Sequence, residues 1–340
     1  MRTSDFDYTL PPECIAQHPA EPRDSSRLLV LDRSTSQVTH RHFRDILNEI
    51  TPPDVLVLNE TRVIPARLNG KKIPGGGKVE VLLLKRISDQ TWEALVGGRG
   101  LKPGRRILLA ESVEAEIMED LGRSKRIVRF STPISTQLDA IGDMPLPPYI
   151  HAPLQSRDQY QTTFARNPGS AAAPTAGLHF TPELLRKIEG SGIRILKVTL
   201  HVGLDTFLPV SEDDPADHVI HTEWCSISPE TAQAANAARR LGGRVIGVGT
   251  TSVRTLETGA NVNPDDGLIA PFEGPTSIFI LPGYSFKGVD AIITNFHLPR
   301  SSLIMMVSAF AGRERILATY QQAVEAGYRF YSFGDAMFIR

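Results

Sequence analysis

The sequence predicts an α/β protein, in which a mixed, mostly parallel and barrel-like α/β domain carries an inserted antiparallel β-barrel domain. The chain has 340 residues, which exceeds one ordinary core and suits two domains. In its second half, helical patterns alternate with β-branched strands, as where helical crossovers join the strands of a parallel sheet. Between about residues 66 and 148, short alternating strands follow one another without a helix, which is typical of a small antiparallel barrel.

The N-terminal segment predicts the first elements of the α/β domain. Residues 28–42 indicate two strands separated by a turn. Apolar residues recur at helical spacing in FRDILNEI (43–50), and Pro52-Pro53 would end this short helix. The run DVLVLN (54–59) is continuously apolar, as in a strand that is buried on both faces of a sheet.

The β insertion alternates apolar and polar residues, with Gly, Pro, Asp and Ser at the breaks. A proline-rich connector, GDMPLPPYIHAP (142–153), follows it. We expect the inserted domain to span residues 66–148 and the α/β domain to comprise residues 1–65 and 149–340. The expected strands of the insertion are 78–87, 91–98, 105–110, 113–120 and 126–131.

Two units of the same layout come next, each with a Thr or Ser N-cap, a proline, a helix, a glycine stop and a strand. The first joins a helix at 181–190 to a strand at 193–200, and the second joins 228–241 to 244–249. They favour a parallel or mostly parallel sheet. The remaining chain predicts strands at 277–283 and 289–296, helices at 301–312 and 314–327, and a final strand within 328–339.

Composition limits the class of protein. The formal net charge is −1 and the isoelectric point is near 6.8, so a nucleic-acid partner would have to be held by local basic patches. The two cysteines, Cys14 and Cys225, form no C-x-x-C pair, which disfavours a disulfide framework. The N-terminus lacks the apolar run of a signal peptide, and the longest apolar stretch is too short for a membrane span. We therefore expect a cytoplasmic protein with no membrane partner.

Three unusual stretches follow predicted strands, at the end of the sheet where open α/β proteins bind ligands. They are HVGLDTF (201–207), GTTSVRTLE (249–257) and NFHLPRSS (295–302). A fourth stretch, AAAPTAGLHFT (171–181), precedes a helix and has small side chains that would let a nucleoside lie against the backbone, with His179 at its end. This convergence predicts a single site.

The stretch 247–257 has the features of an anion site. Gly247 and Gly249 allow close backbone approach, and Thr250 or Thr251 can cap a helix whose free N–H groups suit an anion. Arg254 on the first turn could pair with a carboxylate or phosphate. The alternative is an ordinary capped helix with an exposed arginine.

Histidines, carboxylates and basic residues supply further candidates. The pair His218 and His221 has zinc-like spacing, but without a third ligand we expect hydrogen bonding to a substrate rather than a metal. The carboxylates that could act as acids or bases, or bind ribose hydroxyls, are Glu223, Asp205, Glu257 and Asp335. A basic cluster indicates either RNA phosphate contacts or a solvated face: Arg62, Arg67, Lys71, Lys72, Arg99, Lys102, Arg105 and Arg106.

Seven motifs in order resemble the S-adenosylmethionine:tRNA ribosyltransferase-isomerases, a family of queuosine-biosynthesis enzymes. They are NETRVIPARL, GDMPLPPYI, AAPTAGLHFT, VTLHVG, GVGTTSVRTLE, TNFHLPRSSLIMMVSAFAG and YRFYSFGDAMFI. The resemblance implies the same two-domain fold and consumption of S-adenosylmethionine as a ribosyl donor, with no metal. It implies a tRNA partner carrying 7-aminomethyl-7-deazaguanine at the wobble position, and epoxyqueuosine-tRNA, adenine and methionine as products. The alternatives are an S-adenosylmethionine-dependent tRNA methyltransferase, which lacks a G-x-G-x-x-G motif here, and a non-catalytic RNA-binding protein.

The resemblance also assigns residues. It implies proton transfer by His179 and His201, with Glu223 as a further acid–base group. The residues expected to hold S-adenosylmethionine are Thr175, Gly177, Gly249, Thr250, Thr251, Ser252, Arg254, Asn295 and His297. Those expected to bind RNA are Arg62, Arg67, Lys71 and Lys72, and we expect a monomer. Two departures from the family pattern are Glu60, where Asn is frequent, and Leu204-Asp205, where small residues are frequent.

Overall fold

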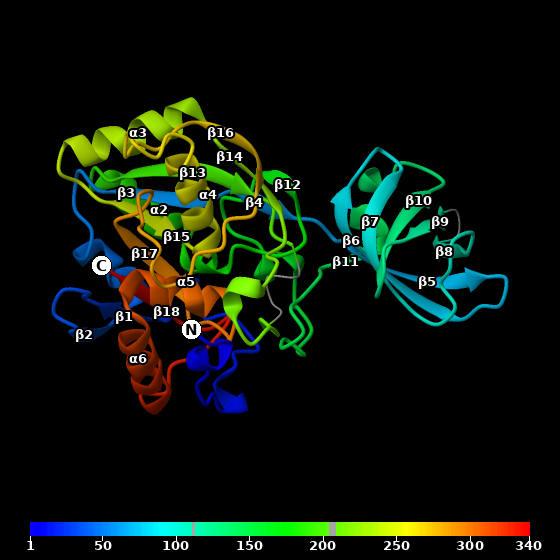
Figure 1. Ribbon diagram of the computed structural model, residues 1–340, viewed down its shortest axis with the longest axis horizontal. Coiled ribbons are helices and arrows are strands. Elements are labelled where there is room, and N and C mark those ends of the chain that lie inside the picture. The colour runs from blue at the N-terminus through cyan, green and yellow to red at the C-terminus, as the bar shows by residue number, and fades with distance from the viewer. Residues whose placement is uncertain (111–112, 204–208) are drawn as a thin grey trace. The chain divides into compact units, whose positions relative to one another are not determined.

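The computed structural model describes residues 1–110, 113–203 and 209–340, and the chain forms two units (Figure 1). The larger unit comprises residues 1–62, 148–167 and 173–340, and the smaller comprises 63–147 and 168–172. Two short strands, β4 (Thr61–Val63) and β12 (Asn167–Ser170), pair with each other. None of the helices in the described ranges has the length and apolarity needed to cross a lipid bilayer.

A nine-stranded mixed sheet forms the centre of the larger unit, in the order β16-β14-β13-β3-β15-β17-β18-β1-β2. The pairs β13–β3, β3–β15, β15–β17 and β1–β18 are parallel. The other four neighbouring pairs are antiparallel. The mixed α/β fold predicted from the sequence is confirmed, with parallel strands at its centre, and β16 and β2 form the edges of this order. The strands are β1 (Arg27–Leu31), β2 (Val38–His42), β3 (Val55–Asn59), β13 (Arg194–Leu200), β14 (Glu223–Ile227), β15 (Val245–Val248), β16 (Phe272–Thr276), β17 (Ala291–Asn295) and β18 (Ala336–Ile339).

The central strands are buried on both faces. Along β3, Val55 and Val57 pack into one apolar cluster, whereas Leu56 and Leu58 pack into the other. Successive side chains of a strand point to opposite faces, so a continuous apolar run supplies both cores at once. The run DVLVLN therefore folds as predicted from its composition.

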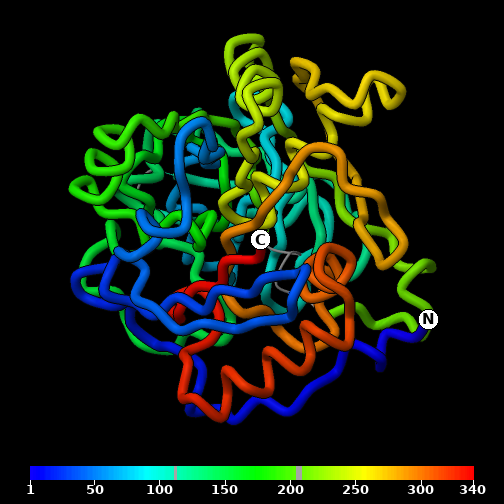
Figure 2. Tube along the Cα trace, turned by 90° about the vertical axis from the view of Figure 1, so that its left-hand side faces the viewer, coloured from blue at the N-terminus to red at the C-terminus, as the bar shows by residue number. Residues whose placement is uncertain are grey.

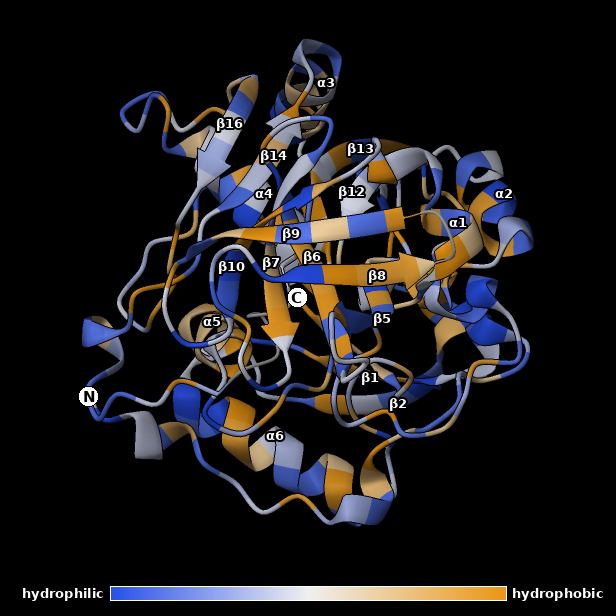
Figure 3. Cartoon of the chain, turned by 90° about the vertical axis from the view of Figure 1, so that its right-hand side faces the viewer, coloured by the Kyte–Doolittle hydropathy of each residue, from blue (hydrophilic) through white to orange (hydrophobic). Residues whose placement is uncertain are grey.

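Helices cover both faces of this sheet. They are α2 (Pro182–Gly190), α3 (Pro229–Arg240), α4 (Thr250–Ala260), α5 (Ser302–Ala311) and α6 (Arg313–Glu325). The predicted caps are confirmed for α2 and α3, because Thr181 accepts a hydrogen bond from the Leu184 amide and Ser228 from the Thr231 amide. Along α6, hydrophobic and hydrophilic segments alternate, and its buried face includes Tyr320 (Figure 3). From α6 the trace returns to the centre of the unit, where β18 ends the chain (Figure 2).

The smaller unit is an antiparallel β-barrel, as predicted. Its strands follow the order β11-β5-β6-β7-β10-β9-β8, and an additional pairing of β5 with β8 closes the barrel. Alternate residues of β7, including Trp92, Ala94 and Val96, are buried, as the period of two requires. The elements are β5 (Arg67–Ile73), β6 (Lys78–Arg86), β7 (Thr91–Gly97), β8 (Arg106–Ala110), β9 (Val113–Asp120), β10 (Lys125–Phe130), α1 (Leu138–Ile141) and β11 (Gly142–Asp143).

Two local predictions differ from the structure, the first in the type of helix and the second in the presence of a strand. The helix expected at 43–50 is a 3-10 helix, η4 (Phe43–Asn48), and this short form buries Phe43 and Ile46. The strand expected at 277–283 is an irregular segment, and the strand β16 lies just before it. In this segment Ile280 is buried in the core but is not part of a strand. The apolar run at 277–283 therefore indicated burial correctly and strand pairing incorrectly.

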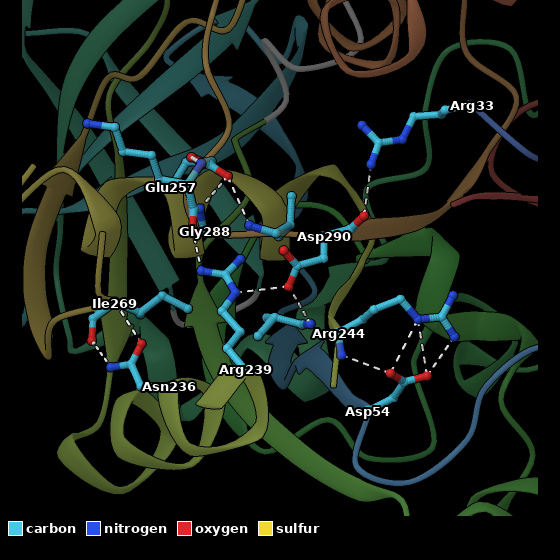
Figure 4. A network of polar contacts seen from close by, with 12 residues as sticks. Arg33, Asp54, Asn236, Arg239, Arg244, Glu257, Ile269, Gly288 and Asp290 are labelled. Atoms are coloured by element: carbon cyan, nitrogen blue, oxygen red, sulfur yellow. Dashed lines mark hydrogen bonds and ion pairs between the residues drawn. The ribbon is translucent and has the colours of Figure 1, made fainter. Parts of the chain in front are cut away.

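Ion pairs fix the amino ends of the central strands (Figure 4). Asp54, just before β3, accepts hydrogen bonds from the Arg244 amide at 2.8 Å and from its Nη2 at 2.6 Å. Asp290, just before β17, accepts from Arg239 Nε at 2.9 Å and from the Val245 amide at 2.8 Å. The charged groups at this end hold the sheet together, and the other end of the same strands carries the predicted site residues.

Candidate functional site

A pocket opens at the carboxyl ends of β15 and β17, within the larger unit. It encloses about 560 Å³ of space, counting the part open to solvent. None of the described residues that line it is an Asp, Glu, Lys or Arg. Its lining includes six of the nine residues expected to hold S-adenosylmethionine: Thr175, Gly249, Thr250, Thr251, Asn295 and His297.

The remaining three expected residues, Gly177, Ser252 and Arg254, do not line this pocket. A Cβ on Gly177 would lie 2.8 Å from the Phe164 ring and 2.9 Å from Thr162 Cγ2, so this glycine is needed for side-chain packing. The Ser252 hydroxyl donates to the Val248 carbonyl at 2.7 Å. The pocket wall formed by the small-residue stretch is the segment 173–176.

The start of α4 differs from the predicted cap. The N-cap position is Gly249, with φ of +83°, and no side chain accepts a hydrogen bond from the first amides. The prediction of Thr250 or Thr251 as the cap is therefore wrong, because the glycine turn places both threonines inside the helix. The first amide with a backbone partner is that of Val253, which donates to the Gly249 carbonyl at 3.2 Å. The amides of the three preceding residues have no such partner in the described part of the chain, and as the first amides of a helix they point toward the pocket end.

His179 lies behind the pocket, within the 3-10 helix η7 (Thr175–His179). Its Nδ1 is 2.8 Å from Ser26 Oγ, and its Nε2 is 3.2 Å from Asn295 Nδ2. Asn295 Oδ1 in turn accepts a hydrogen bond from Thr175 Oγ1 at 3.1 Å. A chain of hydrogen bonds thus joins His179 to two residues of the pocket wall.

Burial keeps the His179 imidazole neutral. The side chain is 4% exposed and stacks on Phe43, with ring centroids 4.9 Å apart. Desolvation, reinforced by the positive charges of Arg329 and Arg23, lowers its pKa from 6.5 to about 3. The side-chain amide of Asn295 donates a hydrogen bond to Nε2, so Nε2 must carry a lone pair. The proton of the neutral ring therefore lies on Nδ1 and is donated to Ser26 Oγ.

His201 follows strand β13 directly. Its Nδ1 is 2.8 Å from Thr61 Oγ1, and the ring stacks on Trp224 with centroids 5.3 Å apart. Burial lowers the pKa of His201. The Thr61 hydroxyl is also 3.5 Å from the Asn167 carbonyl, which can only accept its proton. In that arrangement the ring N–H is on Nδ1, and Nε2 presents a lone pair.

Glu223, the first residue of β14, is held by three neighbours. Its carboxylate forms a buried ion pair with Arg254, lies 3.2 Å from His221 Nε2 and accepts from the Gly203 amide at 2.8 Å. Burial acts to raise the pKa of Glu223, but Arg254 and the other donors outweigh it and the pKa is lowered. Arg254 lies one turn into α4, is paired with Glu223, and is therefore not the exposed anion ligand that the sequence suggested.

His297 is 7% exposed and completes the polar part of the pocket. Its Nε2 is 2.9 Å from Thr294 Oγ1, and its amide donates to Tyr320 Oη at 3.1 Å. Burial lowers the pKa of His297 to about 3. Both pocket-associated histidines, His179 and His297, are therefore neutral at physiological pH.

The other carboxylate candidates have structural partners. Glu257 accepts hydrogen bonds from the amides of Lys287, Gly288 and Val289 (Figure 4). Asp335 accepts from the backbone amides of Arg27 and Arg329. Asp205 and the Leu204-Asp205 departure lie outside the described residues.

The remaining predicted features are less specific. Within the described ranges, no group of three or more His, Cys, Asp or Glu side chains is placed to hold a metal ion. His218, one of the zinc-like pair, is 2.7 Å from Glu212 Oε2. At the Glu60 departure, the side chain accepts from Asn167 Nδ2 at 3.2 Å, beside the strand end that carries Thr61.

The four residues predicted to bind RNA differ in exposure. Arg62 and Lys71 are exposed, whereas Arg67 and Lys72 are half-buried. Lys72 Nζ donates to the Arg99 carbonyl at 2.7 Å, and Arg67 Nη2 lies 3.4 Å from the Leu146 carbonyl. Arg62 belongs to the larger unit and the other three belong to the barrel.

Sequence reasoning missed two residues that orient the histidines, Ser26 and Thr61. Ser26 is 153 positions from His179 in the chain, and Thr61 is 140 positions from His201. Neither serine nor threonine has a distinctive local pattern here. The parallel pair β3–β13 brings Thr61 beside His201, whereas the antiparallel pair β17–β18 turns the amino end of β1, and with it Ser26, toward the carboxyl end of β17.

Comparisons with known proteins agree over the full chain. A family model described as queuosine biosynthesis protein matches residues 3–339. The S-adenosylmethionine:tRNA ribosyltransferase-isomerase of Symbiobacterium thermophilum is 52% identical over 343 residues, and that of Heliobacterium modesticaldum is 53% identical over 345; each match covers 100% of both chains. The crystal structure of S-adenosylmethionine tRNA ribosyltransferase from Thermotoga maritima matches with a TM-score of 0.57 and 38% identity, covering 99% of this chain and 100% of that one.

Proposed function

The chain belongs to the queuosine biosynthesis protein family, and on that premise we propose how its pocket serves ribosyl transfer and isomerisation. The chain is an enzyme of tRNA modification that takes S-adenosylmethionine as its co-substrate. Its acceptor in this proposal is 7-aminomethyl-7-deazaguanine at the wobble position of the anticodon. The products are epoxyqueuosine-tRNA, adenine and methionine.

The observation that carries the proposal is the pocket at the carboxyl ends of β15 and β17. It brings together three helix amides that have no partner among the described residues, a small-residue wall and a buried chain of neutral polar side chains. Such a site suits a nucleoside with a charged amino-acid part, because the wall admits close approach and the amides suit an anion. We assign S-adenosylmethionine to this pocket.

The reaction needs a base, an acid and a positioned amine. A base removes a proton from the ribose carbon beside the sulfonium, whose positive charge makes that proton acidic. We propose His201 for this step, because its lone pair on Nε2 has no hydrogen-bond partner among the described residues and its pKa is lowered. A neutral imidazole can accept a proton, whereas a charged one cannot.

We propose His179 as the second proton-transfer residue, acting at the pocket wall through Asn295. Its neutral ring and its hydrogen bonds to Ser26 and Asn295 support this role. Glu223 remains a further acid–base candidate from the sequence. Its ion pair with Arg254 and lowered pKa favour an ionised group that orders the end of β14 and the Gly203 amide.

The tRNA requires a basic surface that the net charge of the chain does not supply. We propose that Arg62, Arg67, Lys71 and Lys72 contact RNA phosphates, with Arg62 and Lys71 the most accessible. In this proposal the protein acts as a cytoplasmic monomer.

Product analysis tests the function. The protein is incubated with S-adenosylmethionine and tRNA carrying the aminomethyl base, and the nucleosides are examined by mass spectrometry. Free adenine, methionine and an epoxycyclopentanediol adduct are expected. Formation of S-adenosylhomocysteine would indicate a methyltransferase, and no turnover would indicate RNA binding alone.

Substitution of His179 by alanine tests the assigned role. His179→Ala should abolish adduct formation while tRNA binding survives, because the ring orders Asn295 at the pocket wall. Activity within a few-fold of the wild type would remove His179 from the mechanism.

A further inference from the structure

The start of helix α4 has an unsatisfied side chain as well as unsatisfied amides. Thr251 is 8% exposed and lines the pocket, yet its buried Oγ1 has no hydrogen-bond partner among the described residues. A buried hydroxyl without a partner destabilises a fold by about 1–3 kcal/mol. Because the Thr251 hydroxyl lies beside the pocket, we infer that a bound ligand supplies its hydrogen-bond partner.

The backbone around Thr251 adds donors of the same kind. Gly249 turns the chain with φ of +83° and brings no side chain to the first amides of α4. The eleven-residue helix therefore directs several N–H groups and the positive end of its dipole toward the pocket. Together with the Thr251 hydroxyl, these groups match the oxygens of one small anion.

The described residues of the pocket lining include no competing cationic side chain. None of its described lining residues is a Lys or Arg, and Arg254 on the next turn of α4 is paired with Glu223. His297, which also lines the pocket, is neutral because burial lowers its pKa. The start of α4 is therefore the electropositive feature of the lining that the structure describes.

We propose that the first turn of α4, with Thr251 Oγ1 as a donor, binds the carboxylate of the methionyl part of S-adenosylmethionine. This inference rests on the proposed function, since it assigns one part of that co-substrate to one part of the pocket. An RNA phosphate has similar oxygen chemistry, and the experiment below separates the two. The α4 amides and the Thr251 hydroxyl carry no formal charge, so in this proposal they bind the carboxylate without placing a charged side chain beside the reacting ribose.

The test is the Thr251→Val variant, which removes the hydroxyl and keeps the shape of the side chain. Steady-state rates are measured with S-adenosylmethionine varied at saturating tRNA, and then with tRNA varied at saturating S-adenosylmethionine. Loss of a hydrogen bond to a charged group should raise the KM for S-adenosylmethionine by roughly 10- to 100-fold, with little change in the KM for tRNA. Thr251→Ser, which retains the hydroxyl, should have a KM for S-adenosylmethionine close to that of the wild type.

A decarboxylated analogue of S-adenosylmethionine identifies the group that is bound. The wild-type enzyme should have a much higher KM for the analogue than for S-adenosylmethionine. In Thr251→Val this ratio should be roughly tenfold smaller, because the hydroxyl that would bind the carboxylate is already absent. An unchanged ratio would overturn the assignment of the carboxylate. A rise confined to the KM for tRNA would assign the anion as an RNA phosphate and would also overturn it.

Stability supplies the control. Ser308 of α5 also has a buried hydroxyl without a partner among the described residues, but it lies outside the pocket lining. Ser308→Ala and Thr251→Val should both leave the melting temperature equal or higher, and only Thr251→Val should affect S-adenosylmethionine. A large drop in melting temperature for Thr251→Val would mean that the hydroxyl already has a partner, and would overturn the inference. If the wild-type protein consumes no S-adenosylmethionine, the proposed function fails before this comparison is made.

Discussion

The buried neutral histidines predict that the larger unit loses stability in mild acid. His179 and His297 each have a pKa of about 3 when folded and a reference value of 6.5. Between these values the unfolded chain binds a proton at each histidine and the folded chain does not, so stability falls as the pH is lowered. A pH of 5 lies about 1.5 units below the pKa of the unfolded histidine. Each histidine therefore lowers the free energy of unfolding at pH 5 by about 2 kcal/mol.

Carboxylates whose pKa is lowered in the fold lose their contribution below this range. The pKa of Asp54 is lowered, because its hydrogen bonds from Arg244 outweigh the effect of burial, which acts to raise it. A carboxylate of this kind stabilises the fold above its unfolded pKa, near 3.8, and loses that contribution only as the pH falls further. Burial raises the pKa of Glu257, whose contribution changes in the opposite direction, but this contribution is common to the parent and a histidine variant and cancels in their difference.

The measurement uses the two tryptophans of the chain. Trp224 belongs to the larger unit and Trp92 to the barrel, so a Trp92→Phe background makes Trp224 the fluorescent reporter of the unit that contains the site. In this background, urea unfolding is followed at pH 8, 7 and 5 for the parent and for His297→Asn. The variant loses some stability at every pH, but its loss between pH 7 and pH 5 should be smaller than that of the parent by about 2 kcal/mol.

Equal pH dependence in the two proteins would refute the reasoning, because it would mean that His297 takes up a proton in the folded state. A larger acid loss in the variant would refute it as well. The values at pH 8 give the fixed cost of the substitution, since the unfolded histidine is then mostly neutral.

Two further outcomes follow from the structure. Asp54→Asn should lower the free energy of unfolding of the larger unit by about 2 kcal/mol, because it removes the charged acceptor of Arg244 at the amino ends of β3 and β15. The KM for S-adenosylmethionine should stay the same, and a change in KM would contradict the separation of the two strand ends. Lys71→Ala should weaken tRNA binding several-fold and reduce the slope of log affinity against log salt by about 1, as measured by filter binding at several salt concentrations. An unchanged slope would place Lys71 on a solvated face.

The sequence allows prediction of the fold because its patterns are local. Continuous apolar runs such as DVLVLN identify strands buried on both faces, and a Thr or Ser followed by Pro identifies helix starts. The segment 277–283 shows the limit of this reasoning. Its apolar residues are buried, but the pairing of a strand depends on which neighbour is present at the sheet edge, and that is not a local property.

The sequence predicts at which end of the sheet the candidate site lies, but not which side chains contact one another there. The convergence of strand ends predicts a single site, and Thr251 and Asn295, at the ends of β15 and β17, line one pocket. Arg254 shows why individual roles were not predictable. A basic residue on the first turn of a helix suggests an anion ligand, but its partner Glu223 is 31 positions away, on a strand that the topology brings alongside. Pairing of that kind depends on the assembled sheet.

The distribution of charge gives the pocket its chemical character. Charged pairs lie at the amino ends of the central strands, and Glu223 and Arg254 neutralise each other behind the start of α4. Among the described residues, the lining includes hydroxyls, a carboxamide, a neutral imidazole, aliphatic side chains and the residues Tyr149 and Tyr331. Rings and dipoles of this kind tolerate both a sulfonium cation and the neutral thioether that replaces it, because aromatic faces attract a cation and also pack against an apolar group. A fixed negative charge would instead favour the sulfonium reactant and oppose its loss. The uncharged lining of the described part of the pocket therefore suits the proposed reaction, which consumes the charge of its own co-substrate.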